Sequence, residues 1–541
     1  MLDKVKKTIS FLENSLKGGL TLWIVSFFSV IIARLIIEGF LFGFKNQTFE
    51  EFVICFLHTF LFFLLTYLVF LIYIHFTIGN DFKKTASILL WGFWIIIFPP
   101  IIDKIYFKDR MFFDFYLFDG VRGLFEKFIS FFGDNISIGI TLGPRIQVVL
   151  VLILLGFYFF YYKRSWFKTV FFVFGAYCLF FILASIPSII VLIGTIFGEK
   201  NVLEITYNEV SAMFLSPLRY FSHEGVSFIS FMGYKLSFFY IILLFIIISL
   251  MQYFINKEKF LAILKNIRYP QMIFNFGLFF IGMSLGAFYF PEYFKLGFFP
   301  ILAVLNLLIA ILFIWLFSVV VNDIFDLNID KMTNQKRPLV KGVFSEKEYW
   351  ELGFIFLLIA FISSLLIGSK FFIIIIVYTI LTWVYSSPPF RLKKFFPISL
   401  IIASFSSLLF LIMGYILISK EQSLVEFPWR IFWFLFIAYC LIIPIKDLKD
   451  IESDRRFGIK TLPVLFGEKN TRFILAVLVF FCYTFSIYVI SEKELLIPAV
   501  LFGGISFWKI VNKKIPTSCL NWWLLGLVSV YGLFIISFMF L

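Results

Sequence analysis

The stretch FPILAVLNLLIAILFIWLFSVVVNDIFDLNID, residues 299–330, joins a long apolar run without charges to a group of carboxylates. Residues 299–321 exceed the roughly 20 apolar residues that an α-helix needs to cross a hydrocarbon core about 30 Å thick. Such a span has to be helical, because each backbone polar group inside a bilayer must be satisfied within its own segment. The stretch therefore predicts a transmembrane helix that ends in acidic residues.

The composition of the whole chain agrees with a membrane protein. Of its 541 residues, 61% are hydrophobic and only 15% are charged, whereas soluble domains carry about 25% charged residues. In a membrane protein a net charge of +14 reflects cytoplasmic loops and anionic head groups. We therefore expect an all-α, multi-pass protein of the cell membrane whose surroundings are the lipid bilayer, and no nucleic-acid partner.

The C-terminal half contains nine apolar segments of spanning length. Basic connections alternate with short ones that hold few basic residues, and the positive-inside rule places the basic connections in the cytoplasm. The acidic residues 322–330 lie on that side, so we expect a site that faces the cytoplasm. The nine expected spans are 271–290, 297–321, 350–367, 371–386, 398–418, 430–446, 472–490, 495–509 and 520–540.

The N-terminal half contains about six further spans, and long connections at 103–146 and 199–235 are expected to be partly interfacial. We predict a multi-spanning module over residues 1–255 and a second domain over residues 260–541. A role in docking a membrane-protein partner, in substrate delivery, as a separate enzyme or as a scaffold stays open for the first module. Its expected spans are 19–42, 52–77, 85–102, 147–162, 167–197 and 236–255.

Two acidic stretches have similar spacing. In the first, Asn322, Asp326 and Asp330 are four residues apart, so on a helix they share one face, with Asp323 beside them. The second stretch is KDLKDIESDRRFGIKTLPVLFG, residues 446–467, and again follows a predicted span. Its carboxylates are Asp447, Asp450 and Asp454.

Clustered carboxylates repel one another unless a cation neutralises them. Oxygen ligands without nearby His or Cys favour a hard ion such as Mg²⁺, which shares its remaining coordination positions with water and phosphate. Basic residues flank both clusters, and the combination predicts a pocket for a diphosphate with an apolar tail. The flanking residues are Arg337, Arg391, Lys393 and Lys446.

Three other readings compete with this one. A single acidic cluster can be a solvated helix end, but two clusters with like spacing on one predicted side make that reading weak. A cation-coupled transporter would place its acids near the middle of the membrane on discontinuous helices. A non-catalytic membrane scaffold is the third alternative.

Three motifs in this chain resemble those of the UbiA-type membrane prenyltransferases. NDIFDLNIDKMTNQKRPLVKG, residues 322–342, is similar to the first acidic motif of that family, and the stretch at 446–467 to the second. Between them, YSSPPFRLKK, residues 385–394, is similar to the loop that carries Tyr and Lys. The resemblance covers about residues 260–541, roughly half the chain.

The resemblance implies a nine-helix, Mg²⁺-dependent enzyme that transfers a prenyl group from a prenyl diphosphate to a lipophilic acceptor. The acceptor would be an aromatic quinone precursor or a glycerol-phosphate lipid. The resemblance also assigns the catalytic and metal-binding groups. Asn322, Asp326 and Asp330 would hold one ion with Asp323 in support, Asp450 and Asp454 would hold a second with Asp447 in support, and Tyr385 would line the prenyl-cation site.

The resemblance assigns the diphosphate contacts as well. Arg268 in NIRYPQ, residues 266–271, joins Arg337, Lys393 and Lys446 in this role. The spacing between Tyr and Lys varies in this loop, so Arg391 or Lys394 is an alternative to Lys393. Diphosphate departure would leave an allylic cation that aromatic faces stabilise while water is excluded.

Overall fold

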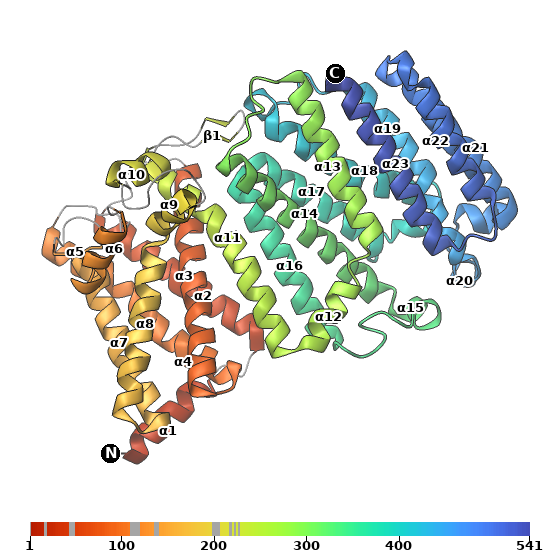
Figure 1. The fold of residues 1–541 in the computed structure, drawn as a ribbon. Coiled ribbons are helices and arrows are strands. Elements are labelled where there is room, and N and C mark those ends of the chain that lie inside the picture. The colour runs from red at the N-terminus through yellow and green to blue at the C-terminus, as the bar shows by residue number, and fades with distance from the viewer. Residues whose placement is uncertain are drawn as a thin grey trace. The chain divides into compact units, whose positions relative to one another are not determined.

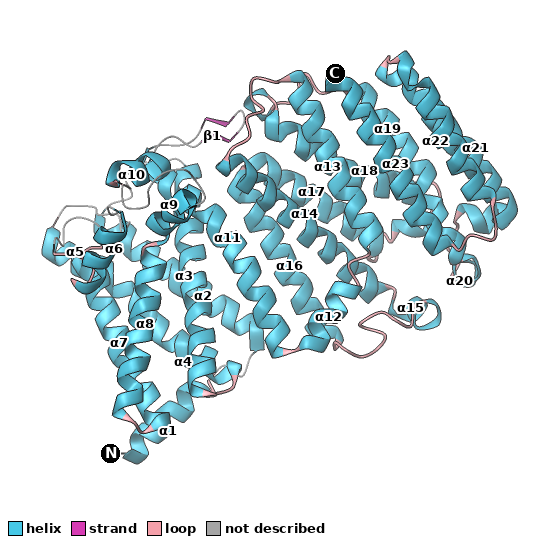
Figure 2. Ribbon diagram, in the orientation of Figure 1, coloured by secondary structure: helices cyan, strands magenta, loops and turns pink. Residues whose placement is uncertain are grey.

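The computed structural model describes residues 2–15, 19–42, 49–108, 120–134, 140–196, 206–215, 219–220, 223–224 and 228–540. Within these ranges helices dominate, and strand structure is confined to a short antiparallel pair, β1 (Arg219–Tyr220) and β2 (His223–Glu224) (Figure 2). The expected all-α class is confirmed.

Fifteen helices in the described part of the chain are long and apolar enough to cross a membrane. Six of these spans end at or before Ile255, and nine begin after it, as the apolar segments predicted. The chain is therefore an integral, multi-pass membrane protein. By its internal contacts it divides into two compact units: an N-terminal unit of Met1–Leu218 with Gly225–Ile255, and a C-terminal unit of Arg219–Glu224 with Asn256–Leu541.

The N-terminal unit is a bundle of long helices with shorter ones at its ends (Figure 1). The expected span 167–197 is wrong in one respect, because it breaks at Ser185. Pro187 follows this break and cannot donate to a continuing helical ladder. The helices are α1 (Leu2–Glu13), α2 (Gly19–Phe42), α3 (Phe49–Ile78), α4 (Phe82–Phe93), η1 (Trp94–Ile97), α5 (Phe98–Phe107), α6 (Gly120–Ile129), α7 (Leu142–Lys163), α8 (Trp166–Ala184), α9 (Ile186–Ile196), α10 (Tyr207–Leu215) and α11 (Phe228–Ile255).

The amphipathic helix α1 is fixed to this bundle by buried polar contacts. The hydroxyls of Tyr158 and Tyr162 donate to Glu13 Oε1 at 2.8 and 2.5 Å. Ser87 on α4 donates to the carbonyl of Leu12. The connection 103–146 contains α6, and its residues 109–119 and 135–139 lie outside the described ranges, as do parts of the connection 199–235.

The C-terminal unit is built around α14 and α18, the spans that are most buried within it. Several helices extend beyond the predicted spans, and α21 begins ten residues before the predicted 472–490 span, with a kink at Gly467. The helices of this unit are α12 (Lys257–Lys265), α13 (Tyr269–Tyr289), α14 (Phe298–Phe325), α15 (Leu327–Thr333), α16 (Glu346–Ile367), α17 (Ser369–Ser386), η3 (Leu392–Lys394), α18 (Ile398–Ile418), η4 (Lys420–Gln422), α19 (Trp429–Ile442), η5 (Ile443–Lys449), α20 (Ile451–Arg456), α21 (Leu462–Ile490), η6 (Lys493–Leu495), α22 (Leu496–Val511) and α23 (Thr517–Phe540).

Glycines let α13 and α18 approach each other closely. A Cβ atom added at Gly282 of α13 would overlap the carbonyl group of Leu411, and one added at Gly414 of α18 would overlap that of Phe279. Small residues of this kind bring helix backbones together inside membranes, where lipid supplies no hydrophobic drive for association. The α13–α18 contact therefore depends on the absence of side chains at these two positions.

Gly282→Ala is expected to destabilise the C-terminal unit by about 1–3 kcal/mol, because the added methyl group forces the two helices apart. The measurement is the thermal unfolding temperature of the purified protein in detergent. Gly277→Ala, on the same helix, is the matched control, because a Cβ there meets nothing within 4 Å. Equal unfolding temperatures for the two variants would contradict the close-packing argument.

Candidate functional site

Both acidic stretches bend at an aspartate. Helix α14 ends at Phe325, Asp326 has φ −101° and ψ 8°, and α15 follows. In the second stretch η5 ends at Lys449, Asp450 has φ −110° and ψ 14°, and α20 follows. The four-residue hydrogen-bond spacing continues through this interruption, because the N–H of Asp326 donates to the carbonyl of Asn322 and that of Asp330 to the carbonyl of Asp326.

Asp323 is the most enclosed carboxylate of the site, with 1% of its side chain exposed. Its Oδ1 accepts hydrogen bonds from Arg268, at 2.5 Å, and from Arg337. Its Oδ2 accepts from Asn266 at 2.7 Å and from Tyr349 at 3.1 Å. Four donors thus surround one carboxylate, and Asp323 fixes the positions of two arginines.

Sequence reasoning missed two members of this network. Asn266 lies two residues before Arg268 in NIRYPQ, and that short spacing was the available signal. Tyr349 lies in the first turn of the apolar helix α16. An aromatic residue there does not indicate that its hydroxyl donates to Asp323, which is 26 residues earlier in the chain.

Asp326 holds the other two cations of the first cluster. Arg391 Nη2 lies 2.8 Å from its Oδ1, and Lys393 Nζ lies 2.5 Å from its Oδ2. Lys393 also donates to Asn322 Oδ1 at 3.0 Å. Burial lowers the pKa of Lys393, and Asp326 counteracts that effect. The structure thus brings Asn322, Asp326, Arg391 and Lys393 together.

Asp330 is buried and turns toward Arg337, whose Nε lies 3.2 Å from its Oδ2. Its Oδ1 accepts from Asn334 at 3.0 Å. The Oδ2 atom is buried and makes no hydrogen bond within the described residues. Burial raises the pKa of Asp330, although Arg337 and Asn334 favour its ionised form.

The second acidic stretch is less neutralised by salt bridges. Lys449 Nζ lies 3.8 Å from Asp450 Oδ2, and Thr461 donates to Asp454 at 3.3 Å. Burial raises the pKa of Asp454 to about 7, and the charges of Asp447 and Asp450 act in the same direction. Burial also raises the pKa of Asp450, against the effects of Lys449 and Arg337. The ionised forms of Asp450 and Asp454 are therefore disfavoured unless a cation binds beside them.

The two stretches meet within the C-terminal unit. Helix α15 contacts α20, and both lie at the same end of the helices of this unit (Figure 1). The N–H of Lys460 donates to the carbonyl of Lys394 at 3.3 Å, which joins the second stretch to the loop 385–394. Tyr385 lies close enough to Lys446, Asp447 and Asp326 for their charges to act on it.

Two of the predicted phosphate-binding arginines have a left-handed backbone. Arg268 has φ 58° and ψ 58°, and Arg391 has φ 43° and ψ 49°. This conformation costs a residue with a Cβ atom about 1–2 kcal/mol. Such strain concentrates at functional sites, where the surrounding structure enforces it. Here each arginine is fixed by a carboxylate, Asp323 or Asp326.

The balance of charge bears on whether Mg²⁺ suits this site. In the described residues no three His, Cys, Asp or Glu side chains come together closely enough to hold a metal ion. The predicted set nevertheless pairs six carboxylates with five cations, so no excess positive charge remains for a diphosphate. Divalent cations would supply that charge, and the oxygen donors of these Asn and Asp side chains suit a hard ion. The donor set therefore fits Mg²⁺, and the individual ligand assignments stay predictions.

Comparison with known proteins bears on the C-terminal unit. The model of the UbiA prenyltransferase family matches residues 279–528. Over 164 residues the chain is 32% identical to probable homogentisate phytyltransferase 2 of Oryza sativa subsp. japonica. This alignment covers 28% of the chain and 42% of that protein. The chain is also 27% identical over 163 residues to digeranylgeranylglyceryl phosphate synthase of Pyrococcus horikoshii. This second alignment covers 29% of the chain and 54% of that protein.

The chain spans about half the length of the curated relatives it matches. Among solved structures, a UbiA homologue from Archaeoglobus fulgidus bound to DMAPP and Mg²⁺ overlays on 51% of this chain and 99% of that chain. The TM-score is 0.37 and the identity 21%. The match of the UbiA prenyltransferase family model to residues 279–528 confirms the resemblance drawn from the motifs.

Proposed function

We propose that the C-terminal unit is a Mg²⁺-dependent prenyltransferase that moves a prenyl group from a prenyl diphosphate to a lipophilic acceptor. The observation that carries the proposal is the contact between two acidic stretches, each interrupted at an aspartate, the first of which holds four partly buried cations. The family match over residues 279–528 supports the same reaction class.

The cations divide into two groups by the carboxylate that holds them. Arg268 and Arg337 are oriented by Asp323 and present a fixed pair of guanidinium groups to the diphosphate oxygens. Arg391 and Lys393 bind Asp326, and we propose that they turn to the diphosphate when it enters. Lys446 would contribute from the second stretch. Their positive charges stabilise the departing diphosphate as the carbon–oxygen bond lengthens.

Asn322, Asp326 and Asp330 would hold one Mg²⁺, and Asp450 and Asp454 a second, with Asp447 in support. Bound Mg²⁺ would neutralise the charge that develops on the leaving diphosphate. We assign Asp323 to positioning instead, because four protein donors already engage its two oxygens.

Tyr385 is the proposed residue beside the prenyl cation. It is half-buried at the end of α17, next to Asp326 and Lys446. An aromatic face stabilises a carbocation once water is excluded. The acceptor would then attack the prenyl carbon and no covalent enzyme intermediate would form.

The acceptor class is proposed as an aromatic quinone precursor or a glycerol-phosphate lipid, because the relatives include proteins named for homogentisate and for digeranylgeranylglyceryl phosphate. The basic connections place the site on the cytoplasmic side in this proposal. A docking role for residues 1–255 toward a membrane-protein partner also stays a proposal. The transporter alternative is disfavoured, because Asp326 and Asp450 lie just beyond the ends of their spans.

A direct test uses the purified full chain in lipid, with radiolabelled geranylgeranyl or farnesyl diphosphate and a membrane lipid extract as the acceptor pool. We expect labelled lipid and free diphosphate to appear with Mg²⁺, to fall to background with EDTA, and to return when excess Mg²⁺ is added. Such reversibility is expected because oxygen-ligand sites for Mg²⁺ exchange the ion with solvent. Product formation that persists in EDTA would contradict the proposed metal dependence.

A further inference from the structure

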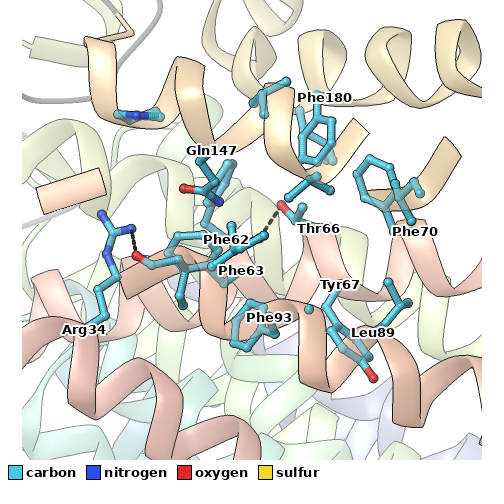
Figure 3. A pocket seen from close by; sticks show the side chains of 18 of the residues that line it. Arg34, Phe62, Phe63, Thr66, Tyr67, Phe70, Leu89, Phe93, Gln147 and Phe180 are labelled. Atoms are coloured by element: carbon cyan, nitrogen blue, oxygen red, sulfur yellow. Dashed lines mark hydrogen bonds between the residues drawn. The ribbon is translucent and has the colours of Figure 1, made fainter. Parts of the chain in front are cut away.

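A cavity of about 1320 Å³ lies inside the N-terminal unit, away from any motif found in the sequence (Figure 3). Pockets for drug-sized ligands usually measure about 300–1,000 Å³. On α3 its lining runs from Phe52 to Ile74. These 22 steps at 1.5 Å per residue make about 33 Å, which is close to the thickness of a hydrocarbon core. The cavity is therefore long as well as large.

The middle of this cavity is apolar and aromatic. Phe62, Phe63, Phe70, Phe93 and Phe180 line it from α3, α4 and α8 (Figure 3). Apolar walls inside a membrane give water few partners, whereas an apolar chain fills such a space favourably. The dimensions and the walls together suit a long hydrocarbon chain.

A buried arginine marks the wall of this cavity. Arg34 of α2 has 12% of its side chain exposed, donates to the carbonyl of Ile96 at 3.0 Å, and places its guanidinium 5.0 Å from the ring centre of Phe63. Its Nε donates no hydrogen bond within the described residues, and the nearest Glu38 oxygen is 3.8 Å away. An ionisable residue inside a span indicates a functional site by default.

Gln147 of α7 lies at the same level as Arg34. The two segments cross where the backbone of Gly143 packs against Pro99. Ile96 comes three residues before Pro99 in its segment, and Gln147 comes four residues after Gly143 in α7. Because α5 and α7 run in opposite directions there, Ile96 and Gln147 lie on the same side of this crossing. Arg34, bonded to Ile96, and Gln147 both line the cavity (Figure 3). One part of the cavity thus offers a polar head an amide and a cation, and the Glu38 carboxylate of the same lining lies 3.8 Å from that cation.

We propose that this cavity binds one long-chain lipid that carries a phosphate head group. The chain lies between α3 and α7, and the phosphate accepts hydrogen bonds from Arg34, whose forked donors suit phosphate oxygens. The inference does not depend on the activity proposed for the C-terminal unit. Two sources offer this chemistry, a membrane phospholipid and a prenyl phosphate.

The test uses the full chain and two probes with a diazirine at the end of the apolar chain: a phosphatidylglycerol and geranylgeranyl monophosphate. After photolysis, peptide mass spectrometry maps the labelled residues. We expect labels on the lining residues of α3 and α7, scored separately from any label in residues 256–541. Labelling by the first probe alone identifies a phospholipid, and labelling by the second alone a prenyl phosphate. Labels confined to lipid-facing residues of the N-terminal unit would overturn the proposal.

A matched pair on α7 separates the cavity from the outer surface. Val151 lines the cavity, whereas Val149 does not and is 42% exposed. Val151→Phe is expected to weaken probe labelling about tenfold or more by filling the space, whereas Val149→Phe leaves it unchanged. Both variants must elute as monodisperse protein. Equal labelling in the two variants would overturn the assignment of the cavity.

Arg34→Gln tests the head group. It is expected to weaken binding of the phosphate probe about tenfold, and to leave binding of the corresponding prenyl alcohol unchanged. A parallel loss for alcohol and phosphate, or no loss for either, would overturn the phosphate contact.

Discussion

Asp326→Ala and Asp450→Ala are each expected to lower prenyl transfer by at least about a thousandfold, because each removes a carboxylate from one of the two proposed metal positions. The two residues occupy the same place in their stretches, at the bend between a spanning helix and a short one. Loss of either position leaves the departing diphosphate without part of its charge compensation. Release of radiolabelled diphosphate measures the effect.

The two variants are expected to differ in donor binding. Asp326→Ala frees Arg391 and Lys393 from their carboxylate, so the prenyl diphosphate should still bind while turnover is lost. Asp450→Ala removes a proposed Mg²⁺ ligand of the second stretch, and it should weaken Mg²⁺-dependent donor binding as well as turnover. Equilibrium binding of the radiolabelled donor separates the two outcomes.

Glu452→Gln is the matched control for these variants. Glu452 is an exposed carboxylate on α20, two residues from Asp450, and has no proposed role. It should retain full activity, and all variants should insert and elute as monodisperse protein. Turnover within about tenfold of the unchanged protein in either aspartate variant would refute the assignment of that carboxylate.

The spans and the acidic stretches could be predicted from the sequence because both are local patterns. Runs of about 20 apolar residues identify helices in a membrane without any knowledge of their neighbours. Carboxylates spaced four residues apart identify a helical face in the same way. In the described part of the chain six candidate spans end at or before Ile255 and nine begin after it, as these runs predict.

Pairings over long sequence distances could not be read in this way. Nothing in the residues around Asp323 identifies Tyr349 as its partner, and the choice of Lys393 over Lys394 depends on how a loop folds back onto Asp326. The bend at Asp326 was also missed, because periodicity predicts that a helix continues until a residue that breaks it. The close approach at Gly282 similarly depends on a helix more than 120 residues away.

The cavity of the N-terminal unit illustrates a further limit. Arg34 and Glu38 are visible in the sequence as a pair four residues apart, which is equally consistent with an ordinary local ion pair. Arg34 and Glu38 both line a long apolar cavity, and this position in the structure favours the proposed binding site over an ordinary local ion pair. A cavity arises from what several helices leave unfilled, and no single segment records it.

Asp323→Asn is expected to destabilise the C-terminal unit by about 3–5 kcal/mol, because it leaves Arg268 and Arg337 without their shared counterion. The substitution keeps the size of the side chain and one acceptor oxygen, so the loss reports charge. Arg337 retains Asp330 at 3.2 Å, which favours the lower end of that range. Tyr349→Phe removes one donor of the same network and is expected to cost only about 1 kcal/mol. Thermal unfolding of both variants measures the difference.

Kinetics distinguish positioning from mere stability in the same variants. If Asp323 orients the two arginines toward the diphosphate, Asp323→Asn raises the KM for the prenyl diphosphate at temperatures where the variant remains folded, because misplaced guanidinium groups lose ground-state contacts. Tyr349→Phe leaves Arg268 and Arg337 on their carboxylate, so its KM should stay near that of the unchanged protein. A destabilised Asp323→Asn variant with an unchanged KM would show that the network supports the fold without positioning the diphosphate contacts.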